Sequence, residues 1–255
     1  ETGYNQRNGR LAHPLFQCQC QWRGRDGEGD PETEAPSESP TPAPRKKREH
    51  KPLPDSIAHI LSLVFSPMLT PTYGVAIAFF ASYLAILPWS VRLSVIGIVS
   101  IITGVIPMTA IWALWRFGYV KDPGLNNRSE RTVPYIVTLV CYLVCAFYLY
   151  KAHAPEWLWS FPAGGAIAIA ICLPVNFRWK ISGHMAGMGG IVAVAFRIAA
   201  GSYYISAIWP WLAATVILAG CIATSRIILG RHTLMQTIAG FAVGFSCVYI
   251  LSAIV

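Results

Sequence analysis

The chain has few acidic residues, and the last of them is Glu156. Of its twelve Asp and Glu residues, four lie after residue 52, namely Asp55, Asp122, Glu130 and Glu156. A two-metal site, or an acid–base pair of carboxylates, needs several acidic side chains that converge on one point. Residues 157–255 contain none, so the sequence excludes these chemistries from that part of the chain.

Cationic side chains remain in the same region. They are Arg178, Lys180, His184, Arg197, Arg226, Arg231 and His232. Cations without counter-ions are costly in an apolar protein. We therefore expect most of them to meet an anion that is not part of the protein, and we interpret Arg197 as a packed or snorkelling residue on the far side.

The seven cysteines offer little chemistry. Five lie inside apolar runs, where a thiol behaves as a small apolar group. Cys18 and Cys20 have only His13 nearby, which is too few ligands for a metal site. The sequence thus predicts no metal and no other cofactor.

Composition divides the chain at about residue 52. Residues 1–52 are rich in Gly, Glu, Pro and Ser and end in the basic run 45–48, so we expect a disordered tail. The whole chain is 54% hydrophobic and 13% charged, with mean hydropathy +0.47. These values are too apolar for a soluble domain of this size. We therefore interpret residues 53–255 as a transmembrane domain.

The apolar segments predict an all-α, polytopic helical bundle. Residues 55–68 mix polar and apolar positions at helical spacing and favour an interfacial helix. Six or seven membrane-spanning helices follow, each near the ~20 residues that cross a hydrocarbon core. The candidate segments are 72–89, 93–117, 132–151, 157–175, 184–202, 204–224 and 233–255.

Three polar connections are each separated by two crossings, so they should emerge on one face of the membrane. The first contains Lys121, Arg128 and Arg131; the second Arg178, Lys180, Ser182 and His184; the third Ser225, Arg226, Arg231 and His232. Three cationic connections at one end of a bundle predict a functional site there.

The local pattern favours an anion at this site. Ser182 is placed to cap the fifth segment, Gly230 to end the sixth, and His232 to stand in the first turn of the seventh. Two helix N-termini would then direct N–H donors and positive dipole ends at one spot. Two histidines can supply a nucleophile and a proton donor for phosphoester cleavage.

These residues resemble the three-part signature of the type-2 phosphatidic acid phosphatase superfamily, which includes lipid phosphate phosphatases and is related to vanadium-dependent haloperoxidases. The first part, Lys, six residues, Arg-Pro, is matched by Lys121 and Arg128, with Ser129 in place of Pro and Arg131 as a competing register. The second, Pro-Ser-Gly-His, is matched by residues 181–184 without its Pro.

The third part is Ser-Arg, five residues, His, three residues, Asp. Here it runs from Ser225-Arg226 through His232 to Gln236, so the spacing is kept but Gln replaces Asp. Gln236 lies one helical turn from His232, and its carbonyl could accept the ring N–H without supplying a charge. An Asp-to-Asn change at a comparable position in a Ser–His–Asp triad costs about 10⁴ in rate, so a catalytically weak homologue that binds phospholipid is one alternative.

The resemblance implies a role for each residue. His232 would attack phosphorus and form a phosphohistidine, and His184 would protonate the departing alcohol. The phosphoryl oxygens would be held by Lys121, Arg128 or Arg131, Ser182, Gly183 and Arg226.

The expected function is a metal-independent phosphatase of the membrane that acts on a lipid phosphate or pyrophosphate, with membrane lipids and no nucleic acid as partners. A lipid phosphotransferase would share the first half-reaction. Phosphatidic acid, phosphatidylglycerol phosphate, isoprenyl pyrophosphate and lipid A 1-phosphate all fit the sequence. We expect an integral protein of a bacterial inner (plasma) membrane. The positive-inside rule and the bacterial relatives give opposite faces for the site, and the sequence leaves this open.

Overall fold

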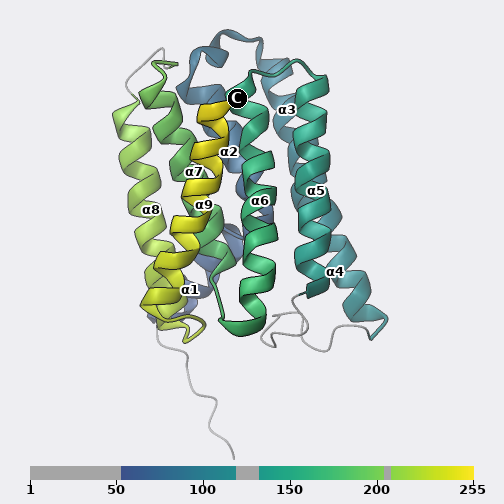
Figure 1. Ribbon diagram of the computed structural model, residues 1–255, viewed down its shortest axis with the longest axis vertical. Helices are drawn as coiled ribbons and strands as arrows, with labels where there is room; N and C mark the ends of the chain where they lie inside the picture. Colours follow the sequence, from purple (N-terminus) through teal and green to yellow (C-terminus); the bar gives the residue numbers. More distant parts are fainter. Residues whose placement is uncertain (1–52, 119–131, 204–207) are drawn as a thin grey trace, which may run out of the picture. The chain divides into compact units, whose positions relative to one another are not determined.

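The computed structural model describes residues 53–118, 132–203 and 208–255 of the chain (Figure 1). The expected tail, residues 1–52, lies outside the described residues, as do Lys121, Arg128 and Arg131. Disorder of the tail and the domain boundary at about residue 52 therefore stay predictions.

The described elements are all helical. In chain order they are α1 (Leu53–Val64), η1 (Pro67–Leu69), α2 (Thr70–Ala81), η2 (Tyr83–Ile86), α3 (Trp89–Ser100), the π-helical turn η3 (Ile101–Val105), α4 (Ile106–Arg116), α5 (Thr132–Lys151), α6 (Glu156–Arg178), α7 (Gly183–Ala200), α8 (Trp209–Ile228) and α9 (Leu234–Ile254).

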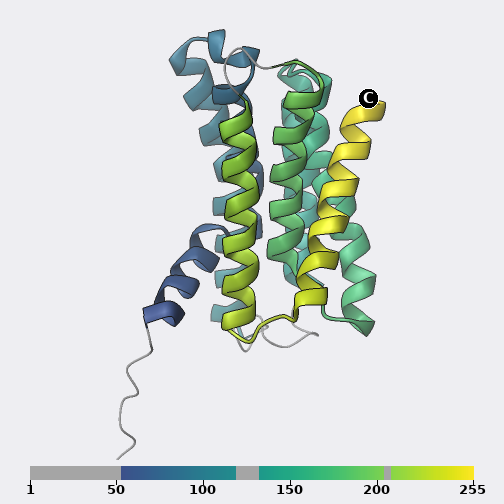
Figure 2. The same cartoon turned by 90° about the vertical axis from the view of Figure 1, so that its left-hand side faces the viewer.

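Seven stretches of the described chain are long and apolar enough to cross a membrane, which confirms the predicted bundle and indicates an integral membrane protein. The first stretch, Asp55–Ala81, joins α1 to α2 across the break at Pro67, and Figure 2 shows α1 inclined to the rest of the bundle. The predicted segment 204–224 is displaced, because α8 begins at Trp209 with Pro210 in its first turn, where proline favours a helix start.

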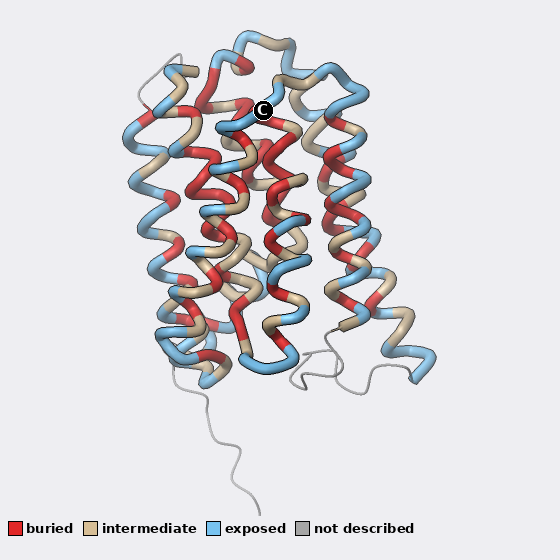
Figure 3. Tube along the Cα trace, viewed as in Figure 1, coloured by how far each residue is buried: buried red, intermediate tan, exposed pale blue. Residues whose placement is uncertain are grey.

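Helix α7 is the central element and the most buried of the candidate spans. It contacts α2, α6, α8 and α9, and the buried residues concentrate on the inner faces of the helices (Figure 3). Small residues bring α7 and α9 together, because a Cβ on Gly240 would meet the Ser182 carbonyl oxygen and one on Gly244 the Ala186 carbonyl oxygen. Close backbone contact through glycine is typical of helix pairs in membranes.

Several helix ends lie together at one end of the bundle. The C-terminal ends of α4, α6 and α8 and the N-terminal ends of α5, α7 and α9 are together at the bottom of Figure 1. The C-terminus of the chain lies at the opposite end. The connection 178–183 and the connection 228–234 therefore share one face of the bundle, and both predicted histidines lie there.

Candidate active site

The first turn of α7 carries His184 and is held by a cap. Ser182 is the N-cap residue, with an extended backbone, and its Oγ accepts a hydrogen bond from Met185 N at 3.4 Å. Its own N–H donates to Gln236 O at 3.3 Å. This bond joins the start of α7 to the first turn of α9, so the two histidine-bearing segments are fixed relative to each other.

Gly230 ends α8 and turns the chain toward His232. Its φ is +61°, in the left-handed region that glycine adopts without a Cβ clash. The N–H groups of Arg231 and His232 then donate to Arg226 O at 3.0 and 3.3 Å. These bonds tie the turn to the last part of α8 and hold the backbone of His232 beside that of Arg226.

The sequence predicted His232 in the first turn of α9, but the structure places it before that helix. The N-cap of α9 is Thr233, and Thr233 and Gln236 form a reciprocal capping box. His232 precedes this cap and is buried, with 7% of its surface exposed. The difference arises because the Thr-x-x-Gln pattern starts the helix one residue later.

The carbonyl oxygen of Gln236 fixes the tautomer of His232. Gln236 Oε1 accepts Thr233 N–H at 3.2 Å and lies 3.2 Å from His232 Nδ1. Since a backbone N–H can only donate, the atom facing it is the amide oxygen, and Nδ1 of His232 must be the protonated nitrogen. The Nε2 atom of the neutral ring then carries the lone pair that a nucleophile needs.

His184 and Arg226 both contact Ser62, which comes from α1. His184 Nε2 lies 2.9 Å from the Ser62 carbonyl oxygen and 3.3 Å from Ser62 Oγ. Arg226 Nη1 donates to the same Oγ. A carbonyl oxygen only accepts hydrogen bonds, so Nε2 of His184 carries a proton in this arrangement.

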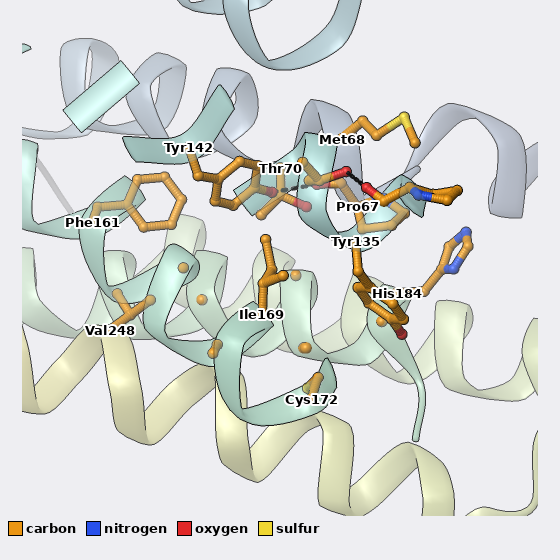
Figure 4. Close-up of a pocket in the computed structure, with 18 of the residues that line it drawn as sticks. Pro67, Met68, Thr70, Tyr135, Tyr142, Phe161, Ile169, Cys172, His184 and Val248 are labelled. Carbon is orange, nitrogen blue, oxygen red and sulfur yellow. Dashed lines mark hydrogen bonds between the residues drawn. The ribbon is translucent and has the colours of Figure 1, made fainter. Parts of the chain in front are cut away.

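A cavity of about 170 Å³ extends from these residues into the bundle. His184, His232, Arg226 and Gly183 line its polar end. Its walls come from η1, α2, α5, α6, α7 and α9 and are mostly apolar, and Figure 4 shows His184 at one end with Phe161 and Val248 at the other. The cavity can therefore receive an anionic group at one end and a hydrocarbon chain beyond it.

The structure brings together only part of the expected site. His184, His232, Arg226 and Gly183 line one cavity. Ser182 and Gln236 are not part of its lining, but the Ser182 carbonyl accepts the N–H of Ala186 and Gln236 Oε1 contacts the ring of His232, and both of these partners line it. Lys121, Arg128 and Arg131 cannot be placed, because they lie outside the described residues. In the described part of the chain, no three His, Cys, Asp or Glu side chains gather as they would around a metal ion.

Sequence reasoning missed two residues of this site. Thr233 could have been found, because the capping-box pattern Thr-x-x-Gln stands in the sequence. Ser62 could not, because its contact with His184 spans 122 positions and no local pattern marks it.

Arg197 lies near the other end of α7, 13 residues and about 20 Å from His184 along the helix axis. Its Nε donates to Ser252 O at 2.9 Å, and its guanidinium lies 5.2 Å from the centre of the Tyr203 ring. That ring stacks on Trp157 with centroids 5.4 Å apart. Arg197 is thus packed away from the cavity.

Residues 173–255 match the model of the PAP2 superfamily. They form a PAP2 superfamily domain. The domain begins near the end of α6 and includes α7, α8 and α9, with His184, Arg226, His232 and Gln236. Lys121, Arg128, Arg131 and Ser62 lie outside the matched residues. No curated protein and no solved structure was found to match the chain.

Proposed function

We propose that this PAP2 superfamily membrane protein hydrolyses a phosphate or pyrophosphate ester of a lipid, without a metal, through a phosphohistidine. The observation that carries the proposal is one cavity with two histidines and an arginine at one end and apolar walls beyond them. A phosphate would lie at the polar end and the lipid chain along the walls. The absence of acidic residues after Glu156 favours an anionic ligand in the same place.

The first half-reaction transfers the phosphoryl group to the protein. His232 Nε2 attacks phosphorus and forms a P–N bond while the P–O bond to the lipid alcohol breaks. A proton from His184 passes to the departing oxygen. Arg226 neutralises the charge that develops on the phosphoryl oxygens, which is normally a large part of catalysis.

The second half-reaction releases phosphate. Water attacks phosphorus, the P–N bond breaks, and His184 takes a proton from the water, so that both histidines return to their first state. Lys121 and Arg128 or Arg131 are proposed as further ligands of the phosphoryl oxygens, as is Ser182.

The uncharged Gln236 supports a second candidate, a protein that binds a phospholipid and turns it over weakly or not at all. Gln236 keeps His232 in the correct tautomer but brings no negative charge to the imidazolium that forms. Phosphotransfer to another lipid is a third outcome, because it shares the phosphohistidine.

The test is phosphate release from a panel of lipid phosphates and pyrophosphates by the purified full chain, compared with His232→Ala. We expect release by the wild type and a loss of about 10⁴-fold or more in the variant, because the nucleophile is gone. Lipid binding without release on any substrate would sink the enzyme proposal and favour the second candidate. Transfer of phosphate to an added lipid alcohol would identify a transferase, and a large gain from Gln236→Asp would show that the native residue limits the rate.

A further inference from the structure

Helix α1 lies outside the PAP2 domain, yet it reaches the polar end of the cavity. Ser62 is half-buried there, and its two oxygens contact His184 and Arg226. These residues belong to α7 and α8, so one residue of α1 connects two helices that carry the proposed chemistry.

The carbonyl of Ser62 belongs to the last turn of α1, where carbonyl oxygens have no partner within the helix. Two nearby carbonyls accept hydrogen bonds from other donors: Leu61 O accepts one from Phe65 N at 2.9 Å, and Val64 O accepts one from the Tyr73 hydroxyl at 2.8 Å. Ser62 O faces His184 Nε2 at 2.9 Å. The end of α1 is thus fixed on both sides of Ser62, with its carbonyl directed at the ring.

A helix C-terminus also carries partial negative charge, which stabilises a nearby protonated histidine. A proton donor must be protonated before the leaving group departs. Ser62 O, at the C-terminal end of α1, therefore lies where it can favour the protonated form of the His184 ring.

The two histidines are therefore held in the same manner. His232 directs Nδ1 at the amide oxygen of Gln236, and His184 directs Nε2 at the backbone oxygen of Ser62. Each ring is oriented by an uncharged oxygen.

Resting on the function proposed above, we propose that Ser62 is a positioning residue of the reaction. Its carbonyl orients and stabilises the protonated ring of His184, and its hydroxyl holds Arg226 in register with that ring. Helix α1 is then a component of the active site, although it does not contact the reacting atoms.

The first experiment compares Ser62→Ala with Ser56→Ala, the same change at an exposed position of the same helix. The full chain is assayed with an alkyl phosphate, which needs a proton on its leaving oxygen, and with p-nitrophenyl phosphate, which does not. We expect Ser62→Ala to lower kcat about tenfold for the alkyl phosphate, because a hydrogen bond to a charged group is lost. A smaller loss is expected for p-nitrophenyl phosphate, no loss for Ser56→Ala, and rescue by Ser62→Thr.

The carbonyl is tested separately by replacing Leu63 with its α-hydroxy acid, which turns the Ser62 amide carbonyl into an ester carbonyl, a weaker acceptor. The same replacement at the exposed Ile60 removes a comparable helix N–H and serves as the control. We expect the ester at position 63 to lower kcat for the alkyl phosphate more than the ester at position 60. In a His184→Asn background, the ester at position 63 should have no further effect, whereas Ser62→Ala should keep the part of its effect that acts through Arg226.

Several results would overturn the proposal. Equal losses on both substrates, together with a lower unfolding temperature, would mean that Ser62 only supports folding. A gain in activity from Ser62→Ala would mean that the hydroxyl of Ser62 competes with the substrate for Arg226 or His184. An active, His232-dependent wild type with unchanged kcat in both Ser62→Ala and the ester at position 63 would remove the positioning role alone. A wild type without phosphate release would remove it together with the proposed function.

Discussion

Arg197 near one end of α7 and Arg226 of α8, near the other end, are two arginines of an apolar protein that are held in different ways. At one end Arg197 lies over Tyr203, which stacks on Trp157, and Arg197 donates to the carbonyl of Ser252. At the other end Arg226 and His184 share Ser62 and line a cavity. The first arrangement is filled by protein, whereas the second leaves room for a ligand. A cation in a membrane helix therefore indicates a functional site only when its surroundings are open.

The largest difference between the two ends is expected in the activity of variants in which one arginine is replaced. Arg226→Ala should lower kcat/KM by about 10²–10³-fold, because a donor to the developing charge is lost. Arg197→Ala should leave the activity of the folded protein unchanged but lower its free energy of unfolding by about 1.5–3 kcal/mol, because a hydrogen bond from a charged group is removed. Kinetics and thermal unfolding in detergent measure both effects.

The matched control is Arg226→Lys, which keeps the charge and loses the planar fork, so it should recover part of the activity. Equal kinetic losses in Arg226→Ala and Arg197→Ala would show that both ends act only through stability.

An intermediate effect is expected at Gln236. Gln236→Glu keeps the length of the side chain and the capping box while adding a negative charge beside His232. Because that charge stabilises the imidazolium, we expect kcat to rise several-fold, with an accompanying gain in stability at the helix N-terminus. The measurement is kcat for one lipid phosphate, with thermal unfolding in parallel.

Gln236→Met is the control, since it has similar size but no acceptor for either N–H. It should lower both kcat and the unfolding temperature. A Glu variant slower than the native protein would mean that the uncharged amide suits the reaction better than a carboxylate.

The smallest kinetic effect is expected from the contact between α7 and α9. A Cβ at Gly244 would press on the backbone of Ala186, so Gly244→Ala should destabilise the protein by about 1–3 kcal/mol and lower kcat only a few-fold. Gly220, exposed on α8, has open space around a Cβ, so Gly220→Ala should stabilise by about 1 kcal/mol or less. Thermal unfolding distinguishes the two. Equal changes of the unfolding temperature in the two variants would mean that α7 and α9 can move apart at Gly244 without a loss of stability.

Much of the fold could be predicted because long apolar runs permit few alternatives in a membrane. The membrane-spanning helices were predicted from the length of the apolar segments. That the polar connections lie at one end of the bundle was predicted from the number of crossings between them. Helix starts were less certain, because Pro210 and the Thr233–Gln236 pair each define a boundary more sharply than hydropathy does.

The candidate site was predictable only where its residues lie in local patterns. His184, Arg226 and His232 stand at spacings that the sequence displays, and the structure places them around one cavity. The contact of Ser62 with His184 depends on how α1 packs across α8, which no spacing encodes. The contributions of Lys121, Arg128 and Arg131 stay predictions.

The bond between Ser182 N–H and Gln236 O has a mechanical consequence. A change in bilayer thickness acts first on the tilt of lipid-facing helices. Helices α7 and α9 are joined by this bond and by backbone contacts at Gly240 and Gly244, so they should tilt as one body. The separation of His184 and His232 should then stay constant in thin and thick membranes, and the turnover rate should depend on the chain of the substrate more than on the host bilayer.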